Sequence, residues 1–202
     1  MNLPLHISTE SNYCWIQIPK CASSTLRTVL QKFTKKTTDD KDEWKKTYLT
    51  NKLKTRFNFT FVRNPFDRLV SCYSDKILNH TRWSGKKRQS DSIHYMIEHE
   101  YDFSEFVKKI TTDFYGHDDH WLNCSKFIPH DYTEYGFIGK CENLKTDFEY
   151  VCENLKIPIS ELPKSNKTNH NHYTEYYTNE IRKIVENVYA DDIDRFSYKF
   201  GD

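Results

Sequence analysis

The chain carries one stretch that decides its fold class, Ile16-Gln17-Ile18-Pro19-Lys20-Cys21-Ala22-Ser23-Ser24-Thr25-Leu26-Arg27. The apolar run from Tyr13 to Ile18 predicts a buried strand, and the residues after Pro19 predict a tight loop and then a helix. The loop begins with a lysine and is rich in hydroxyl side chains. Such a strand-to-helix turn directs a cation and backbone N–H groups toward one place, as α/β proteins do when they hold phosphate.

A second stretch repeats this arrangement, Phe59-Thr60-Phe61-Val62-Arg63-Asn64-Pro65-Phe66-Asp67-Arg68-Leu69-Val70-Ser71. Arg63 follows a predicted strand over 57–62, and Pro65 suits the first turn of the next helix. Arg63 and Ser71, two helical turns apart, are suited to grip one phosphate together. The two turns together imply a ligand with two separated anionic groups. Simpler interpretations are an N-capping serine in the first turn, a salt bridge for Arg63 and a packing role for Ser71.

The rest of the chain alternates between helical and strand patterns. Apolar residues at helical spacing predict helices over about 24–33, 66–77, 92–99, 104–111, 143–155 and 178–190. A third strand is predicted over Tyr135–Gly139. Alternating strands and helices favour a parallel sheet flanked by helices. The chain shows no internal repeat and no linker, so we expect a single domain over residues 1–202.

Composition excludes several classes of function. The 30 basic and 29 acidic residues leave a net charge of +1, which argues against bulk nucleic-acid binding. No apolar run of about 18 residues is present, so no transmembrane helix is expected. No signal peptide is visible either, and the expected location is cytoplasmic. Six scattered cysteines without a C-x-x-C pair favour reduced thiols.

The two stretches resemble the two cofactor motifs of the carbohydrate sulfotransferases, the chondroitin and HNK-1-type Golgi enzymes with their bacterial and viral relatives. The first resembles the loop for the 5′-phosphosulfate and the second resembles the 3′-phosphate site. The resemblance continues, in order, through three further segments: Asp119-His120-Trp121, then 135–144, then 188–198. A Golgi-lumenal location would follow only if an anchor had been removed from this chain.

This resemblance implies a P-loop-NTPase-like, three-layer α/β fold with a central parallel sheet. The implied cofactor is 3′-phosphoadenosine 5′-phosphosulfate (PAPS), with the product PAP, and no metal is required. By position, the 5′-phosphosulfate is held by Lys20, Cys21, Ala22, Ser23, Ser24 and Thr25. Lys20 would also stabilise charge on the bridging oxygen, and Arg63 and Ser71 would bind the 3′-phosphate. The sequence departs from the family at Cys21, where many relatives carry Thr or Gly.

An acceptor hydroxyl needs a base that works near neutral pH. Residues 31–57 contain no histidine, and His120 is the best candidate for the base. The neighbouring acidic residues 118 and 119 are placed to orient its ring, and Trp121 is placed to stack on a sugar. Two alternatives remain open: His120 and Trp121 form a structural core pair, or His117, His120 and Cys124 form part of a zinc site.

The sequence therefore predicts a PAPS-dependent sulfotransferase that acts on a hydroxyl of a carbohydrate. A protein tyrosine or a small alcohol is the alternative acceptor. A non-catalytic module that binds 3′-phosphoadenosine nucleotides is the alternative from another class. A nucleoside-phosphate kinase is a third reading, but the chain lacks the glycine pattern G-x-x-x-x-G-K-[ST] of such enzymes.

Overall fold

The structure is a computed structural model that describes residues 5–8, 10–33, 37–38, 56–83, 90–129, 136–159, 162 and 171–202. Its internal contacts divide the chain into two compact units, Met1–Arg63 with Lys126–Asn166 and Asn64–Ser125 with Lys167–Asp202. The chain passes from the first unit to the second inside the second motif, directly after Arg63. The expectation of a single domain stays a prediction.

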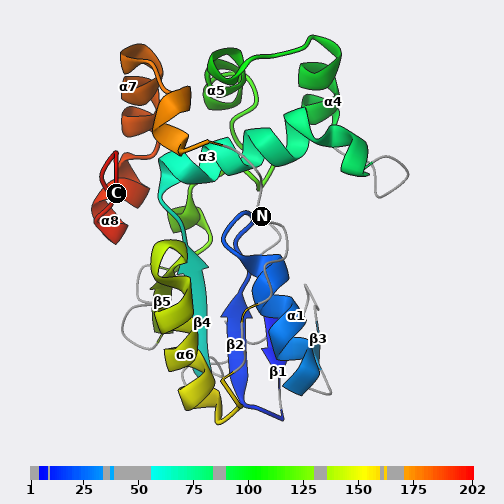
Figure 1. The fold of residues 1–202 in the computed structure, drawn as a ribbon, viewed down its shortest axis with the longest axis vertical. Coiled ribbons are helices and arrows are strands. Elements are labelled where there is room, and N and C mark those ends of the chain that lie inside the picture. The colour runs from blue at the N-terminus through cyan, green and yellow to red at the C-terminus, as the bar shows by residue number, and fades with distance from the viewer. Residues whose placement is uncertain are drawn as a thin grey trace. The chain divides into compact units, whose positions relative to one another are not determined.

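The first unit contains a sheet with the strand order β3-β1-β2-β4-β5 (Figure 1). Strands β2 (Tyr13–Ile16), β4 (Phe57–Val62) and β5 (Gly136–Lys140) are parallel, with Tyr13 opposite Phe57. The predicted parallel core is therefore confirmed, with the third strand one residue later than expected. Strands β1 (Leu5–Ser8) and β3 (Thr37–Thr38) extend it antiparallel. Neither was predicted, because such short segments carry too few residues for a recognisable alternation.

Helices α1 (Ser23–Phe33) and α6 (Leu144–Leu155) flank this sheet (Figure 1). Along the chain, α1 comes after β2 and α6 comes after β5. Both have one buried apolar face, as their helical spacing predicted. On β5, a side chain at Gly139 would lie 2.5 Å from the ring of Phe61, so only glycine fits there. The expected α/β, P-loop-like arrangement of a central sheet flanked by helices is thus confirmed.

The second unit is helical. It contains α3 (Pro65–Tyr73), which continues into a π-helical turn (Ser74–Leu78), and then α4 (Asp91–Glu98), α5 (Phe103–Thr111), α7 (Asn179–Val188) and α8 (Ala190–Phe196). Short 3-10 turns lie at His80–Trp83 and Tyr173–Tyr176. The predicted final helix over 178–190 ends earlier than expected, and a separate helix follows it. Asn64 caps α3 because its side chain accepts a hydrogen bond from the Phe66 N–H.

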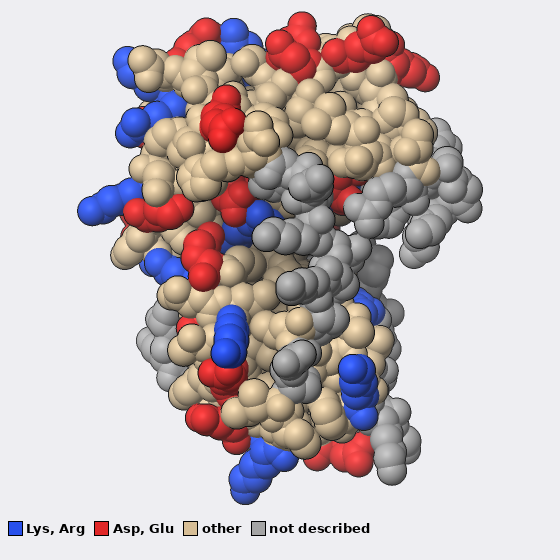
Figure 2. All heavy atoms as spheres, viewed as in Figure 1, with Lys and Arg blue, Asp and Glu red and all other residues tan. Residues whose placement is uncertain are grey.

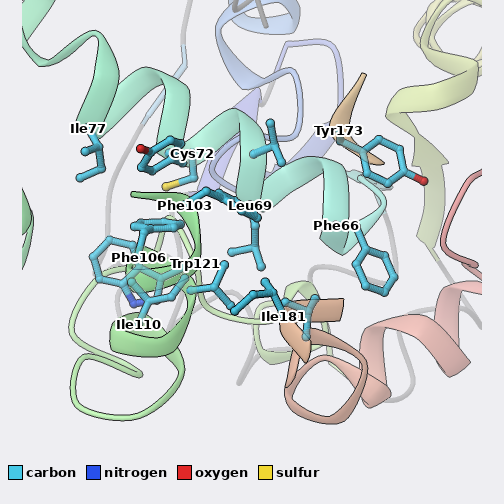
Figure 3. Close-up of a cluster of buried hydrophobic side chains, with 14 of the residues drawn as sticks. Phe66, Leu69, Cys72, Ile77, Phe103, Phe106, Ile110, Trp121, Tyr173 and Ile181 are labelled. Carbon is cyan, nitrogen blue, oxygen red and sulfur yellow. The ribbon is translucent and has the colours of Figure 1, made fainter. Parts of the chain in front are cut away.

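The apolar faces of these helices meet in one core (Figure 3), which includes Phe66, Leu69, Phe106, Trp121 and Ile181. Capping residues Asp102 and Glu105 fix the start of α5 through reciprocal hydrogen bonds.

In the part of the chain that the structure describes, no helix is long and apolar enough to cross a membrane. None of the six cysteines, all of which lie among the described residues, forms a disulfide, and five of them are buried.

Candidate active site

The loop between β2 and α1 has an unusual backbone for a segment without glycine. Lys20 and Ala22 adopt left-handed conformations, with φ of +66° and +57°. Each such residue costs about 1–2 kcal/mol unless it is glycine. Alternation of left- and right-handed residues turns successive N–H groups toward one side, which makes a concave site for an anion. The strained backbone is therefore a candidate binding feature rather than a connecting turn alone.

Local hydrogen bonds hold this loop, which we call the Lys20 loop (residues 18–25). The Ile18 carbonyl accepts bonds from the Cys21 N–H at 3.2 Å and from the Ser23 hydroxyl at 2.7 Å. Farther along α1, the Arg27 guanidinium donates to Oε1 of the buried Gln17 at 2.5 Å, which ties the helix to the end of β2. The loop is thus held at both sides by residues close to it in sequence.

The N-terminus of α1 adds a second candidate feature for binding an anion. The first intrahelical bond runs from the Leu26 N–H to the Ala22 carbonyl at 3.1 Å, and the N–H groups before it have no acceptor within the helix. No acidic residue lies in the first turn of α1. The positive end of the helix dipole therefore faces the loop without a competing negative charge.

The candidate residues of this loop differ in what they expose. Lys20 and Ala22 are half-buried and Ser24 is exposed, whereas Cys21 and Thr25 are buried. The Ser23 hydroxyl donates its proton to Ile18, so in this conformation Ser23 offers its backbone N–H rather than its side chain. The thiol of Cys21 is buried and its N–H donates to the Ile18 carbonyl, so Cys21 helps to shape the loop.

Arg63, from the second strand-to-helix turn, contacts the Lys20 loop, and both lie in the first unit. Nη1 of Arg63 donates to the Lys20 carbonyl at 3.4 Å, so the guanidinium lies beside the loop although 43 residues separate the two in sequence. The structure thus brings Lys20 and Arg63 together, as two converging phosphate turns require. Ser71 lies in α3 of the second unit and is 3% exposed.

In the second unit, His120 forms a pair with Asp118. Oδ1 of Asp118 lies 2.5 Å from Nδ1 of the His120 ring and accepts a second bond from the His120 N–H at 2.9 Å. Burial raises the pKa of Asp118, but the hydrogen bonds and the electrostatic attraction from His120 outweigh it and lower the pKa below its usual value. With Nδ1 engaged, Nε2 remains to accept a proton, and the His120 side chain is 31% exposed.

The second neighbouring carboxylate does not share this role. Burial raises the pKa of Asp119, and the negative charge of Asp118 raises it further. The main-chain carbonyl of Asp119 accepts a bond from Arg68. Of the two carboxylates that the sequence offered as partners of His120, the structure selects Asp118.

A network of buried side chains holds the segment around His120, which we call the His120 loop (residues 112–125). The guanidinium of Arg68, 1% exposed, donates to the carbonyls of Leu122 at 2.5 Å and Asp119 at 3.2 Å. The Tyr189 hydroxyl donates to the Trp121 carbonyl. The carboxylate of Asp192 accepts from two backbone N–H groups, those of Cys124 at 2.6 Å and Ser125 at 2.8 Å.

Arg68, Tyr189 and Asp192 are the supporting residues that sequence reasoning missed. Arg68 had one available signal, because a charged residue lay within a stretch predicted to be an apolar helix. Tyr189 lay on the apolar face of the predicted helix over 178–190, and Asp192 lay in a tail that was recognised by resemblance. Its physical role is to fasten the His120 loop from a distant part of the chain.

The structure corrects one expectation and disfavours another. Trp121 cannot stack on a sugar, because it is 0% exposed and its Nε1 donates to the Phe114 carbonyl. It is a core residue, while its neighbour His120 remains accessible. No group of three or more His, Cys, Asp or Glu residues that could hold a metal ion occurs among the described residues, which include His117, His120 and Cys124. The zinc alternative therefore has no geometric support.

Figure 2 shows the charged side chains on one face of the molecule. Among the described residues on that face, Lys and Arg are scattered and interspersed with acidic residues, and they do not merge into a continuous basic patch. This distribution agrees with the nearly neutral net charge of the chain.

Comparison with known proteins gives a consistent result. The chain is similar to carbohydrate sulfotransferase 11 of Mus musculus, with 29% identity over 174 residues, which covers 74% of this chain and 49% of that protein. It is also similar to carbohydrate sulfotransferase 10 of Rattus norvegicus, with 26% identity over 125 residues, covering 54% and 35%. The chain thus spans half or less of the length of these relatives. No solved structure matches it.

The family profile described as "Sulfotransferase family" matches residues 4–199, which include the Lys20 loop, Arg63, Ser71 and the His120 loop. The match covers nearly the whole chain and spans both compact units. On this evidence the chain belongs to the sulfotransferase family.

Proposed function

We propose that this protein transfers a sulfuryl group from PAPS to a hydroxyl group of a carbohydrate. The observation that carries the proposal is the convergence of Arg63 on the strained Lys20 loop at the N-terminus of α1. A pair of cationic turns suits a donor with separate 5′ and 3′ anionic groups, as PAPS has. The carbohydrate acceptor is supported by the names of the relatives.

Most of the residues that we assign to the donor lie in the first unit. When bound, PAPS supplies an activated sulfuryl group. In this proposal the N–H groups of the Lys20 loop and the first turn of α1 bind the 5′ end, and the Lys20 ammonium offsets the charge that develops as the sulfuryl group leaves. Arg63 and Ser71 bind the 3′-phosphate. Sulfuryl transfer then depends mainly on positioning and on electrostatic stabilisation, as phosphoryl transfer does.

His120 is the proposed general base. Asp118 holds its ring by Nδ1, so Nε2 is the atom that takes the proton from the acceptor hydroxyl. The fixed ring and the exposed fraction of the side chain support this role. A buried structural histidine would lack this exposure.

A thermal-shift experiment tests the nucleotide site first. PAP at a hundred times its Kd should stabilise the fold by about 2.7 kcal/mol, whereas 5′-AMP, ADP and ATP at equal concentration should act less. Equal responses to PAP and 5′-AMP would contradict the role of Arg63 and Ser71. A preference for ATP would instead favour the kinase reading.

A transfer assay then separates an enzyme from a binding module. Incubation with ³⁵S-labelled PAPS and a panel of unsulfated oligosaccharides should label a sugar. Stabilisation by PAP without labelling of any sugar, tyrosine peptide or small alcohol would mean that the protein binds the nucleotide without transferring sulfate.

A further inference from the structure

A set of partly exposed aromatic rings lies on α4 and on the His120 loop in the second unit. Tyr95 of α4 is 37% exposed, and the exposed ring of His99 stacks on it with 4.1 Å between centroids. The half-buried ring of Phe114 meets Tyr95 edge-on at 5.8 Å. These rings and that of His117, 5.6 Å from Phe114, form what we call the aromatic surface.

Part of the aromatic surface lies on the same loop as the candidate base. His117 and Phe114 lie on the same loop as His120, and the His117 N–H donates to the Phe114 carbonyl at 3.0 Å. The Trp121 indole donates to the same carbonyl at 3.0 Å. The buried Trp121 therefore fixes the position of Phe114, although it offers no ring of its own to a ligand.

The charge around the rings favours a neutral occupant. Nζ of Lys109 lies 5.5 Å from the ring centroids of Tyr95 and Phe114, in the range of a cation–π contact. The same ammonium is paired with Asp113 at 2.5 Å, so its charge is compensated within the cluster. A polyanion would gain little there, whereas a sugar ring presents C–H groups to aromatic faces and hydroxyls to polar ring edges.

We propose that the aromatic surface binds the sugar residues that flank the acceptor hydroxyl. The occupant is an unsulfated stretch of the acceptor oligosaccharide. This inference rests on the proposed function, because it assigns a substrate contact to the same reaction. Tyr95 and His99 then determine affinity for the sugar chain, while His120 acts on the hydroxyl.

The test compares variants of the full chain with the oligosaccharide that the wild-type protein sulfates fastest in the panel. Tyr95→Ala and His99→Ala should each raise the KM for this sugar roughly five- to tenfold, the scale of one lost aromatic contact. The kcat at saturating sugar and the thermal shift with PAP should stay at wild-type values. Tyr95→Phe keeps the ring and should keep the wild-type KM. Tyr150→Ala, which removes a tyrosine that is 47% exposed in the first unit, is the matched control.

Each remaining outcome has a definite meaning. An unchanged KM in both Tyr95→Ala and His99→Ala overturns the inference alone, and so does an equal rise in Tyr150→Ala. A Tyr95→Phe variant as weak as Tyr95→Ala would assign the effect to the hydroxyl and would overturn the role of the ring. A wild-type protein that binds PAP but sulfates no sugar overturns the proposed function, and this inference falls with it.

Discussion

The Lys20 loop and the His120 loop are held in place by opposite means. In the first, the bond between Ser23 and Ile18 spans five residues of sequence, and the strained turn is followed by a regular helix. In the second, the bonds that Arg68 and Tyr189 make to the loop span 54 and 68 residues. One loop is shaped by its own main chain, and the other is fastened by buried side chains from distant helices.

This difference predicts how substitutions in each loop affect ligand binding and stability. The Lys20 loop depends on local backbone geometry, so single side-chain changes there should affect binding more than folding. The His120 loop depends on satisfied buried polar groups, and removal of one partner leaves others without hydrogen bonds. Substitutions in the Lys20 loop should therefore change ligand binding and turnover. Substitutions of the buried partners of the His120 loop should lower the free energy of unfolding.

The largest expected effect is at His120. His120→Ala removes the proposed base and should lower kcat by roughly 10²- to 10⁴-fold, the range for general-base catalysis. Stabilisation by PAP should persist, because the nucleotide residues are unchanged. His172→Ala, which alters an exposed histidine, is the control. If His120→Ala loses PAP binding and unfolds, the histidine is structural and the two loops do not divide their roles as described.

Next come the two cations of the first unit. Lys20→Ala and Arg63→Ala should each lower turnover at least about a hundredfold, because each removes a charge that faces the reacting or anchoring group. Circular dichroism and the Tm without ligand should change little. Lys32→Ala, at the exposed C-terminal turn of α1, should behave as wild type. Near-normal PAPS turnover in either test variant would overturn the assignment of the Lys20 loop.

The third prediction concerns the support of the His120 loop. Asp192→Ala leaves the N–H groups of Cys124 and Ser125 without their acceptor, and Asp192 is 1% exposed. The free energy of unfolding should fall by about 2–6 kcal/mol, at about 1–3 kcal/mol for each N–H group that loses its acceptor. Urea unfolding measures it, with the exposed neighbour variant Asp191→Ala as control. A loss below that of Asp191→Ala would show that distant side chains do not hold this loop.

The smallest effect is expected at Ala22. Ala22→Gly relieves a left-handed strain of about 1–2 kcal/mol, but the added chain entropy favours the unfolded state by roughly 0.5–1 kcal/mol. Stability should therefore stay equal or rise slightly, whereas Ala22→Val should be destabilised. Ala190→Gly, at the start of α8, should lose stability instead. Thermal unfolding compares the three, and a clear loss in Ala22→Gly would mean that the loop is not strained in solution.

Local pattern was sufficient for much of the first unit. The apolar run before Pro19, the strand over 57–62 and the helical spacing after each turn predicted β2, β4, α1 and the start of α3. These features depend on neighbours within a few residues, because strand and helix periodicity are local properties. The antiparallel strands β1 and β3 were missed because four and two residues contain too little pattern.

By itself, the sequence determined the two strand-to-helix turns, their cations and the position of His120 as a candidate base, since each follows from residue type and spacing. Only the tertiary structure decided which carboxylate orients His120, that Trp121 is buried, and that Arg68, Tyr189 and Asp192 fasten the loop. The physical reason is that these contacts join residues far apart in the sequence. Buried polar partners are selected by three-dimensional packing across many tens of residues, and no local pattern encodes that choice.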